Sequence, residues 1–328
     1  MENPSNFPLL RLPFLAIKEV LNSMSPFEII SFSKIPHSQC KDLVTCETKK
    51  YQIEVSIEGN LSLKIFGNIG PIFDYIITSN SGENGARKLK INGDEELYVY
   101  SEPGSMFEKL KEIVEEVKTC LKLGIYFIAL DFDKLPDRNK ETADWLGPQS
   151  SSTSYISLFG NRAKRQDVVY FLNQITTTEN LLLDVRIAKW INLPVVTKDL
   201  IFSRNSGYLM GLDSLLKMKC PSIGLWTFQL TNRDLNQFLK MWYRRECHQN
   251  LKQIWISRGW HWNGLNEILE GIDREERDKG QELNIEPFQG PVLGVAEIRR
   301  IDGAIATVCS VEHKNYVHVL MKVCSSDK

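Results

Sequence analysis

Asp131 and Asp133 are the residues of this 328-residue sequence whose type and spacing first suggest catalysis. They follow an apolar stretch that is typical of a strand. Carboxylates at the carboxyl end of a buried parallel strand can act as nucleophile and general acid/base in a magnesium-dependent phosphatase. That chemistry calls for a threonine where Leu135 stands, and for acidic residues downstream, whereas GDEE at 93–96 lies upstream. A motif without its context is weak evidence, so a solvated turn capped by aspartate is favoured.

Histidine and cysteine side chains could also bind a metal. His313 and His318, with Cys309, lie on a segment of alternating polarity that has no carboxylate at ligand spacing, so a structural role is favoured. The seven cysteines include no CxxC pair, and their odd number argues against a disulfide framework. The GNIG sequence at 67–70 is not followed by GK[ST] and predicts a turn. We therefore expect no metal, no cofactor and no catalytic residue.

Composition narrows the possible partners. Charged residues make up 25% and apolar residues 42% of the chain, and the formal net charge is −1. This charge gives no electrostatic reason to bind nucleic acid or an anionic membrane, and the basic pairs Lys164-Arg165 and Arg244-Arg245 fit solvated helix faces. No apolar stretch is long enough to span a bilayer. With reduced thiols and no signal peptide, we expect a cytoplasmic or nuclear protein.

The elements that would position any binding surface begin with two short helices. Pro13 suits a helix start, because its missing N–H would be unpaired in the first turn. This helix must end near Ser23, because residues before Pro26 are biased away from helical torsion angles. Ser25 then predicts a second start as an N-cap, with proline at the first helical position and Glu28 completing a capping box.

Both helices carry more apolar surface than one face can hold. One face of the first helix is formed by residues with helical spacing, namely Ile17, Val20, Leu21 and Met24. Further apolar residues lie outside that face, namely Leu9, Leu10, Leu12, Phe14, Leu15 and Phe27. One side can therefore bury against the rest of the chain, and the other side is available for a partner.

In the middle of the chain, apolar and polar residues alternate as is typical of β-strands. Residues 51–59 and 60–68 predict a β-hairpin that turns at Gly59-Asn60. A charged amphipathic helix over 106–120 and an apolar strand over 124–133 follow. Residues 137–154 are polar and end in a serine-rich run, which predicts a linker.

Helix and strand then alternate. The predicted helices cover 167–174, 211–218 and 231–242, and they lead to strands at 181–187, 222–228 and 251–257. In the last helix, Thr231 caps with help from Asp234, and the expected buried stripe is Leu235, Phe238, Leu239 and Trp242. Units of this kind resemble an irregular leucine-rich arrangement. Near the C-terminus, Asp302-Gly303 predicts a hairpin.

The opening stretch resembles an F-box. The Leu-Pro, amphipathic helix, polar-Pro turn and second apolar helix of that family correspond here to Leu12-Pro13, residues 17–24, Ser25-Pro26 and residues 29–32. FPLLRLPFLAIKEVL is similar to the F-boxes of the large nematode families. LTNRDLNQFLKMW followed by NLKQIWI, and IRRIDGAIATV near the end, resemble the F-box-associated domain type 2 that accompanies these F-boxes.

The resemblance implies an α+β chain of three parts. These are a helical F-box over 1–45, a β-rich middle region over 46–145, and an F-box-associated type 2 domain over 150–325. The last part is expected to be an irregular leucine-rich-repeat-like α/β domain that ends in a β-hairpin. The implied function is that of a substrate-recognition subunit of an SCF-type cullin–RING ubiquitin ligase. The F-box would bind the Skp adaptor and, through it, the cullin scaffold, while the C-terminal domain would hold a protein substrate and raise its effective concentration.

One departure leaves alternatives open. F-boxes usually continue into a third helix rich in Ser, Cys, Lys and Arg, whereas this sequence continues as KIPHSQC at 34–40, where Pro36 blocks a long helix. A second interpretation is therefore a non-catalytic interaction protein with a degenerate F-box that no longer binds the adaptor. A remote third is the magnesium-dependent phosphatase built on Asp131 and Asp133. The sequence names neither the substrate nor any dependence on phosphorylation.

The resemblance and the spacing together give two sets of candidate residues. The adaptor contacts are expected from Leu12, Pro13, Ile17, Val20, Leu21, Met24, Pro26 and Ile29. The three C-terminal strands each follow a helix, so we expect them side by side in a parallel sheet. If Leu181, Leu183, Val185, Ile187, Ile254 and Ile256 point inward, alternation sends a substrate surface outward, namely Asp184, Arg186, Trp226 and Trp255. The alternative, that both tryptophans belong to the core, is decided by their burial.

Overall fold

The computed structural model describes residues 12–35, 51–67, 70–175, 177–186, 196–203, 211–226, 229–259, 262–276, 290–314 and 316–324. Outside these ranges lie Leu9, Leu10, Ile187 and residues 36–40 of the KIPHSQC segment. The chain divides into two compact units, Met1–Ala129 (unit 1) and Leu130–Lys328 (unit 2). The boundary falls inside strand β6 (Ile125–Asp131).

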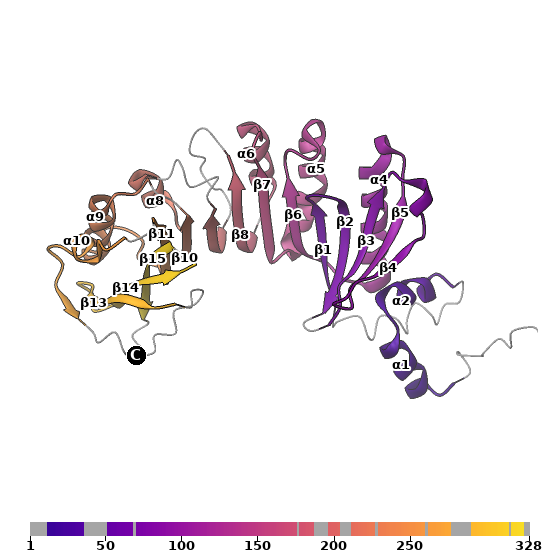
Figure 1. Ribbon diagram of the computed structural model, residues 1–328, viewed down its shortest axis with the longest axis horizontal. Helices are drawn as coiled ribbons and strands as arrows, with labels where there is room; N and C mark the ends of the chain where they lie inside the picture. Colours follow the sequence, from indigo (N-terminus) through magenta and orange to yellow (C-terminus); the bar gives the residue numbers. More distant parts are fainter. Residues whose placement is uncertain are drawn as a thin grey trace, which may run out of the picture. The chain divides into compact units, whose positions relative to one another are not determined.

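Unit 1 begins with two short helices and continues into a mixed sheet (Figure 1). Its helices are α1 (Phe14–Ser23), α2 (Pro26–Ser33) and α4 (Met106–Leu121). Its strands are β1 (Tyr51–Ile57), β2 (Leu61–Gly67), β3 (Phe73–Thr78), β4 (Arg87–Leu89) and β5 (Glu95–Tyr100), in the order β1-β2-β3-β5-β4, with β6 next to β1. The predicted hairpin is confirmed: β1 and β2 pair antiparallel, and Gly59 has a φ of +51° in the turn.

The core of unit 1 lies on one face of this sheet. Alternate residues of β1 and β2 are 0–3% exposed, namely Ile53, Val55, Ile57, Leu61, Leu63 and Ile65. Helix α4 packs against β2 and β3 and contributes the buried stripe Phe107, Leu110, Ile113, Val114, Val117 and Leu121. The charged amphipathic helix predicted for 106–120 is thus confirmed, with its charged residues on the other side.

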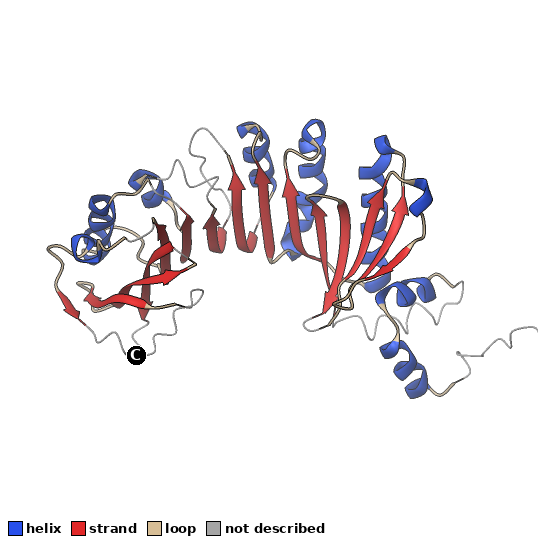
Figure 2. Ribbon diagram, in the orientation of Figure 1, coloured by secondary structure: helices blue, strands red, loops and turns tan. Residues whose placement is uncertain are grey.

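Unit 2 alternates helices and strands before it ends in antiparallel strands (Figure 2). Its helices are α5 (Asn139–Leu146), α6 (Arg165–Gln174), α8 (Leu212–Lys217), α9 (Asn232–Tyr243) and α10 (Leu265–Ile268). Its first strands are β7 (Tyr155–Gly160), β8 (Thr177–Val185), β9 (Val196–Phe202), β10 (Ser222–Trp226) and β11 (Gln253–Arg258). The later strands are β12 (Arg274–Glu276), β13 (Val292–Arg299), β14 (Ile305–His313) and β15 (Tyr316–Cys324).

The strand order in unit 2 is β12-β13-β14-β15-β11-β10-β9-β8-β7. Strands β7 to β11 run parallel, which confirms the parallel direction predicted for the three C-terminal strands and the pairing of β10 with β11. Strand β9, which the sequence reasoning missed, lies between β8 and β10, so these two are not direct neighbours. Strands β11, β15, β14, β13 and β12 pair antiparallel in turn, and the hairpin at Asp302-Gly303 joins β13 to β14.

Two expectations about unit 2 are corrected. Residues 137–154 were expected to form a linker, but they contain α5, whose Ala143 and Leu146 are buried because they form an apolar helical face in a polar sequence. A leucine-rich-repeat-like array is not evident among the described residues. After β11 the next strand in the sheet is the antiparallel β15, so the parallel order stops instead of continuing as a repeat. The chain is a mixed α/β protein.

Candidate protein-binding surfaces

The ends of the two N-terminal helices are set by the residues that the sequence indicated. Helix α1 starts directly after Pro13 and ends at Ser23, and Met24 is extended. The capping box of α2 is present: the Ser25 backbone N–H donates to Glu28 Oε2 at 2.8 Å, and the Glu28 N–H donates to Ser25 Oγ at 3.3 Å. The two helices are therefore separate elements joined by a fixed two-residue turn.

The eight residues predicted to contact an adaptor differ in accessibility. Ile17, Leu21, Pro26 and Ile29 are buried within unit 1. Leu12, Val20 and Met24 are half-buried, and Pro13 is exposed. The helical spacing thus located the side of α1 that faces the protein's own core, and half of the predicted set is not accessible on the surface of this chain.

The accessible apolar surface of α1 lies at its start. Phe14 is 57% exposed and Leu15 is 73% exposed. Both residues lie outside the helical face that contains Ile17 and Leu21, and this position predicted a second apolar side of α1. The structure shows that both side chains are exposed. Large apolar side chains that are adjacent and exposed on one helix are a candidate contact for a partner protein.

Helix α2 is held against the sheet by one aromatic side chain. Phe27 is 1% exposed, and its ring packs edge-to-face against Phe73 at 5.6 Å and Tyr75 at 4.8 Å between centroids. The guanidinium of Arg87 lies 5.7 Å from the centre of the Phe27 ring, and Lys34 pairs with Glu116 of α4. These contacts fix α2 on the same body as the sheet of unit 1.

The second candidate surface is the face of the unit 2 sheet that lacks helix contacts. On the opposite face, Leu181, Leu200, Ile223 and Ile254 are paired neighbours in successive strands, and Ile254 lines the space next to Leu235 and Phe238 of α9. The row on the other face consists of Leu182, Ile201, Gly224, Trp255, Leu320, Cys309 and Val295. The inward positions of Ile254 and Ile256 and the outward direction of Trp255 follow the predicted alternation.

Trp255 is nevertheless buried, at 6% exposure, and this corrects its assignment to an exposed substrate surface. It forms an apolar cluster with Val295, Cys309, Val311 and Leu320. All four come from the antiparallel strands, which follow in the chain and cover the indole. Trp226 packs against the cluster and is only half-buried, so it is the tryptophan that reaches the surface.

Asp184 and Trp226 lie on the same face of the sheet, with Ser203 at the end of β9 between them. Ser203 donates to Asp184, and Ser203 follows Phe202, which pairs with Leu225 beside Trp226. Two strand spacings separate the positions, about 10 Å. Arg186, two residues beyond Asp184, is exposed. The structure thus brings Asp184, Arg186 and Trp226 to one edge, with Trp255 beneath Trp226 as a support.

An aromatic cluster that the sequence did not reveal surrounds Trp226. Its ring is edge-to-face with those of Trp255, Tyr316 and His318, at 5.9, 5.9 and 5.5 Å between centroids. His318 is fully buried, and its Nδ1 is hydrogen-bonded to Ser257 Oγ at 2.8 Å. Burial lowers the pKa of His318 to about 4, so the ring is neutral at physiological pH. The buried, neutral His318 therefore supports Trp226 with an aromatic ring and adds no charge there.

The candidate catalytic aspartates serve the local backbone. Asp131 Oδ1 accepts from the Asp133 N–H at 2.9 Å, and the Asp133 carboxylate accepts from the N–H groups of Asn161 and Arg162 at 2.7 and 3.0 Å. This geometry fits the capped turn that was favoured from the sequence. Among the described residues, no group of three His, Cys, Asp or Glu side chains is arranged to hold a metal ion.

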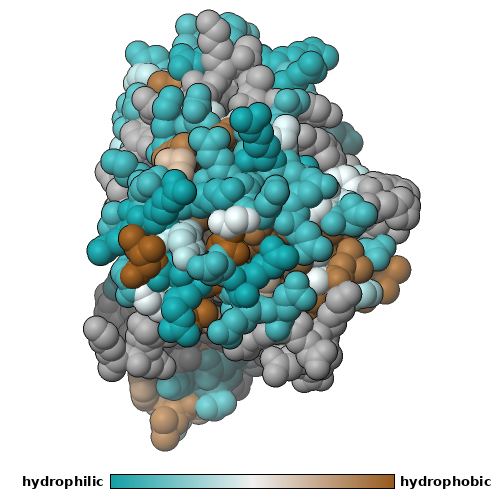
Figure 3. All heavy atoms as spheres, turned by 90° about the vertical axis from the view of Figure 1, so that its left-hand side faces the viewer, coloured by the Kyte–Doolittle hydropathy of each residue, from teal (hydrophilic) through white to brown (hydrophobic). Residues whose placement is uncertain are grey.

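The third surface, around β13 and α10, is mainly hydrophilic. Figure 3 shows apolar side chains there in small separate patches. Exposed apolar residues in this part of the chain include Leu293 at 39% and Ile301 at 66%. Scattered apolar residues of this kind are normal on a protein surface, so they do not indicate an interface.

Comparison with known proteins supports the resemblance of the C-terminal part to F-box-associated domains. Residues 193–256, which include β9, α8, β10, α9 and most of β11, match the family described as F-box associated. The chain is 24% identical, over 93% of its length, to the Skn-1 dependent zygotic transcript 15 protein of Caenorhabditis elegans, 94% of which is covered. No solved structure matches the chain. The predicted resemblance to an F-box-associated domain is confirmed for residues 193–256, and the predicted similarity to a nematode protein is confirmed.

Hydropathy adds one further finding. Within the part of the chain that the structure describes, no helix is both long and apolar enough to cross a membrane.

Proposed function

We propose that this protein is a substrate-recognition subunit of an SCF-type cullin–RING ubiquitin ligase. The observation that carries the proposal is the F-box associated segment at 193–256, in a chain whose first helices have the F-box pattern of Leu12-Pro13 and the Ser25-Pro26 turn. The protein would bind a Skp-type adaptor through its N-terminal helices and a protein substrate through unit 2.

The adaptor surface that we propose includes the exposed and half-buried members of the predicted set, together with two additional residues. Leu12, Pro13, Val20 and Met24 remain candidates, and Phe14 and Leu15 extend them. The buried residues Ile17, Leu21, Pro26 and Ile29 would hold the helices in place and so act on binding indirectly. Burying Phe14 and Leu15 on association would remove them from water, which is worth about 1.5–3 kcal/mol for each large apolar side chain.

The substrate surface that we propose lies at the edge formed by Asp184, Arg186 and Trp226. A half-buried tryptophan beside charged groups is a common composition for protein-binding surfaces. In this role the protein does no bond chemistry of its own. It holds a target near a ubiquitin-loaded conjugating enzyme, so that one reactant is concentrated next to the other. This function places the protein in the cytoplasm or nucleus.

The second interpretation is an interaction protein whose degenerate F-box no longer binds the adaptor. It is favoured by the burial of half of the predicted contact residues within unit 1. The phosphatase interpretation lacks such support, because the carboxylate of Asp133 is occupied by two backbone N–H groups.

One experiment separates these interpretations. The full-length protein is mixed at micromolar concentration with a purified Skp-type adaptor, and the mixture is analysed by size-exclusion chromatography with light scattering. We expect a complex with one copy of each chain. If the two proteins elute separately at every ratio, the ligase proposal is wrong and the degenerate F-box remains.

A further inference from the structure

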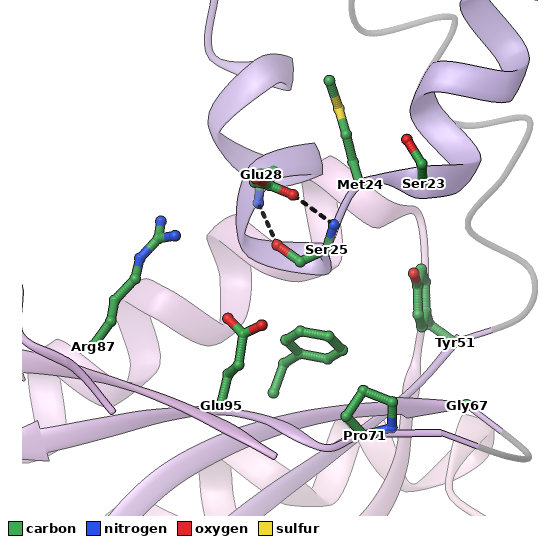
Figure 4. A pocket seen from close by; sticks show the side chains of 10 residues that line it. Ser23, Met24, Ser25, Glu28, Tyr51, Gly67, Pro71, Arg87 and Glu95 are labelled. Carbon is green, nitrogen blue, oxygen red and sulfur yellow. Dashed lines mark hydrogen bonds between the residues drawn. The ribbon is translucent and has the colours of Figure 1, made fainter. Parts of the chain in front are cut away.

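A cleft of about 730 Å³ separates the turn between α1 and α2 from the sheet of unit 1 (Figure 4). Ser25 of the turn forms one wall, and Phe73, Arg87 and Glu95 of the sheet stand opposite it. Figure 4 shows the side chains of Arg87 and Glu95 pointing from the sheet toward the first turn of α2. This volume is within the range of protein binding sites.

The walls of the cleft are fixed before any partner binds. The capping box holds the first turn of α2, and Phe27 locks that helix to Phe73. On the sheet side, Phe73 and Glu95 are paired neighbours, and the Glu95 N–H donates to the Ile72 carbonyl at 2.9 Å. A preformed cleft costs little conformational entropy when it is filled.

The sheet side of the cleft presents two side chains of opposite charge, Arg87 and Glu95, that do not neutralise each other. Within the described residues, neither Arg87 nor Glu95 forms an ion pair. The two residues are nevertheless close in the sheet, because Arg87 of β4 is the paired neighbour of Leu97 of β5, and Glu95 lies two residues before Leu97 on β5. The guanidinium of Arg87 rests on the Phe27 ring instead. The carboxylate of Glu28, the other acidic group at the cleft, is already used by the capping box.

The cleft is continuous with the proposed adaptor surface. Helix α1 begins with the exposed Phe14 and Leu15, its exposed residues Glu19 and Asn22 follow at helical spacing from Leu15, and the helix ends at Ser23 on the rim of the cleft. From residue 15 to residue 23 a helix rises about 12 Å. A polypeptide segment of four or more extended residues would therefore reach from Leu15 into the cleft.

We propose that this cleft is a second part of the adaptor interface and receives an adaptor segment that carries both an acidic and a basic side chain. Arg87 binds the acidic group, Glu95 binds the basic group, and their order fixes the register of the segment. Residues of the β-rich sheet thereby contribute to adaptor binding, in addition to the two N-terminal helices. This inference rests on the proposed function.

The test exchanges the two charges. The double variant Arg87→Glu with Glu95→Arg keeps the net charge of the protein but inverts the order of charges in the cleft. A matched control, Lys109→Glu with Glu112→Lys, inverts an ion pair of 2.8 Å on the solvent side of α4 in the same unit. Calorimetric titration of each full-length protein with the purified adaptor measures affinity at low and high salt.

We expect the cleft variant to bind at least about tenfold more weakly than the wild type and the control variant to bind as the wild type does. Because the Arg87 variant could loosen α2, Glu95→Gln is measured as well. It leaves the packing on Phe27 intact and should weaken the salt dependence of binding. Equal affinity of the wild type, the exchanged variant and Glu95→Gln would overturn the cleft proposal while the ligase proposal stands. If the wild type itself does not bind, the ligase proposal fails and the cleft proposal fails with it.

Discussion

The indole of Trp255 lies across the Cα of Gly224 on the neighbouring strand, in the space that a Cβ would fill. The indole nitrogen would be only 2.8 Å from such a Cβ. Both residues lie within the F-box associated segment, and Trp255 also belongs to the apolar cluster with Val295, Cys309, Val311 and Leu320 of the antiparallel strands. Gly224 does not have the positive φ that favours glycine. The reason for a glycine at this position is therefore the close approach of the Trp255 ring, which leaves no room for a Cβ.

Gly224→Ala is therefore expected to destabilise unit 2. Overpacking at a buried contact typically costs about 1–3 kcal/mol, which chemical denaturation can measure. The same change in a Trp255→Phe background should cost less, since the smaller ring leaves room for a methyl group, and contacting residues of this kind couple by about 0.5 kcal/mol or more. Gly259→Ala, where no atom lies within 4 Å of the added Cβ, is the control. Equal losses at positions 224 and 259 would contradict the contact.

Leu15→Asp should weaken adaptor binding at least tenfold without lowering stability. The side chain is 73% exposed, so its replacement removes apolar contact surface and leaves the core intact. Ile91→Asp is the matched control, because Ile91 is fully exposed in the same unit and does not line the cleft. Adaptor affinity is measured by calorimetry and stability by thermal unfolding. If both variants lose affinity equally, the exposed start of α1 is not the contact.

Leu21→Ala should lower stability without removing a side chain that contacts the adaptor. Leu21 is 1% exposed, so truncation should cost about 2–5 kcal/mol of stability. Any loss of adaptor binding should then follow from unfolding and recover when the folded fraction is restored at low temperature. A folded Leu21→Ala protein that still fails to bind would place this residue in the interface after all.

Asp74 should make stability fall as pH rises from about 4 to about 6. Burial raises its pKa from 3.8 to about 6, opposed by Lys64 and by a hydrogen bond from Ser62, and Glu96 and Glu54 add to the rise. Because the folded state holds this proton more tightly than the unfolded state, the contribution is largest below pH 3.8 and is lost above pH 6. Asp74→Asn should stabilise the protein at pH 7 by at most about 3 kcal/mol and should give no gain at pH 4. Denaturation of both proteins across this range measures the difference, and a gain that is the same at both pH values would contradict it.

His318 should make stability fall as pH decreases from about 6.5 to about 4. Burial lowers its pKa from 6.5 to about 4, opposed by a backbone hydrogen bond and reinforced by the nearby His313. The unfolded state therefore binds the proton more tightly, so this contribution is complete above pH 6.5 and is lost as pH falls toward 4. We expect the His318 imidazole to remain neutral at pH 5.5 in an NMR titration, and His318→Gln to remove this part of the acid sensitivity. A ring that titrates near pH 6.5 would show that it is not buried in solution.

The sequence by itself determined the ends of the helices and the direction of alternate side chains. Proline at 13 and 26, the Ser25–Glu28 capping box and the Thr231–Asp234 capping box act within three or four residues, so they can be recognised without the fold. The buried stripe of α9 and the parity of Ile254 and Trp255 follow in the same way from local geometry.

Only the tertiary structure decided which of these faces are covered. Trp255 points away from the helices as its position in the strand predicts, but it is buried because strands β13, β14 and β15, which come later in the chain, cover it. Ile17 and Leu21 have the spacing of a binding face, yet unit 1 buries them and leaves Phe14 and Leu15 exposed. Strand β9 and helix α5 escaped prediction because their sequences are too polar or too short for a clear period. Burial depends on residues that are distant in the sequence, and no local pattern records which residues those are.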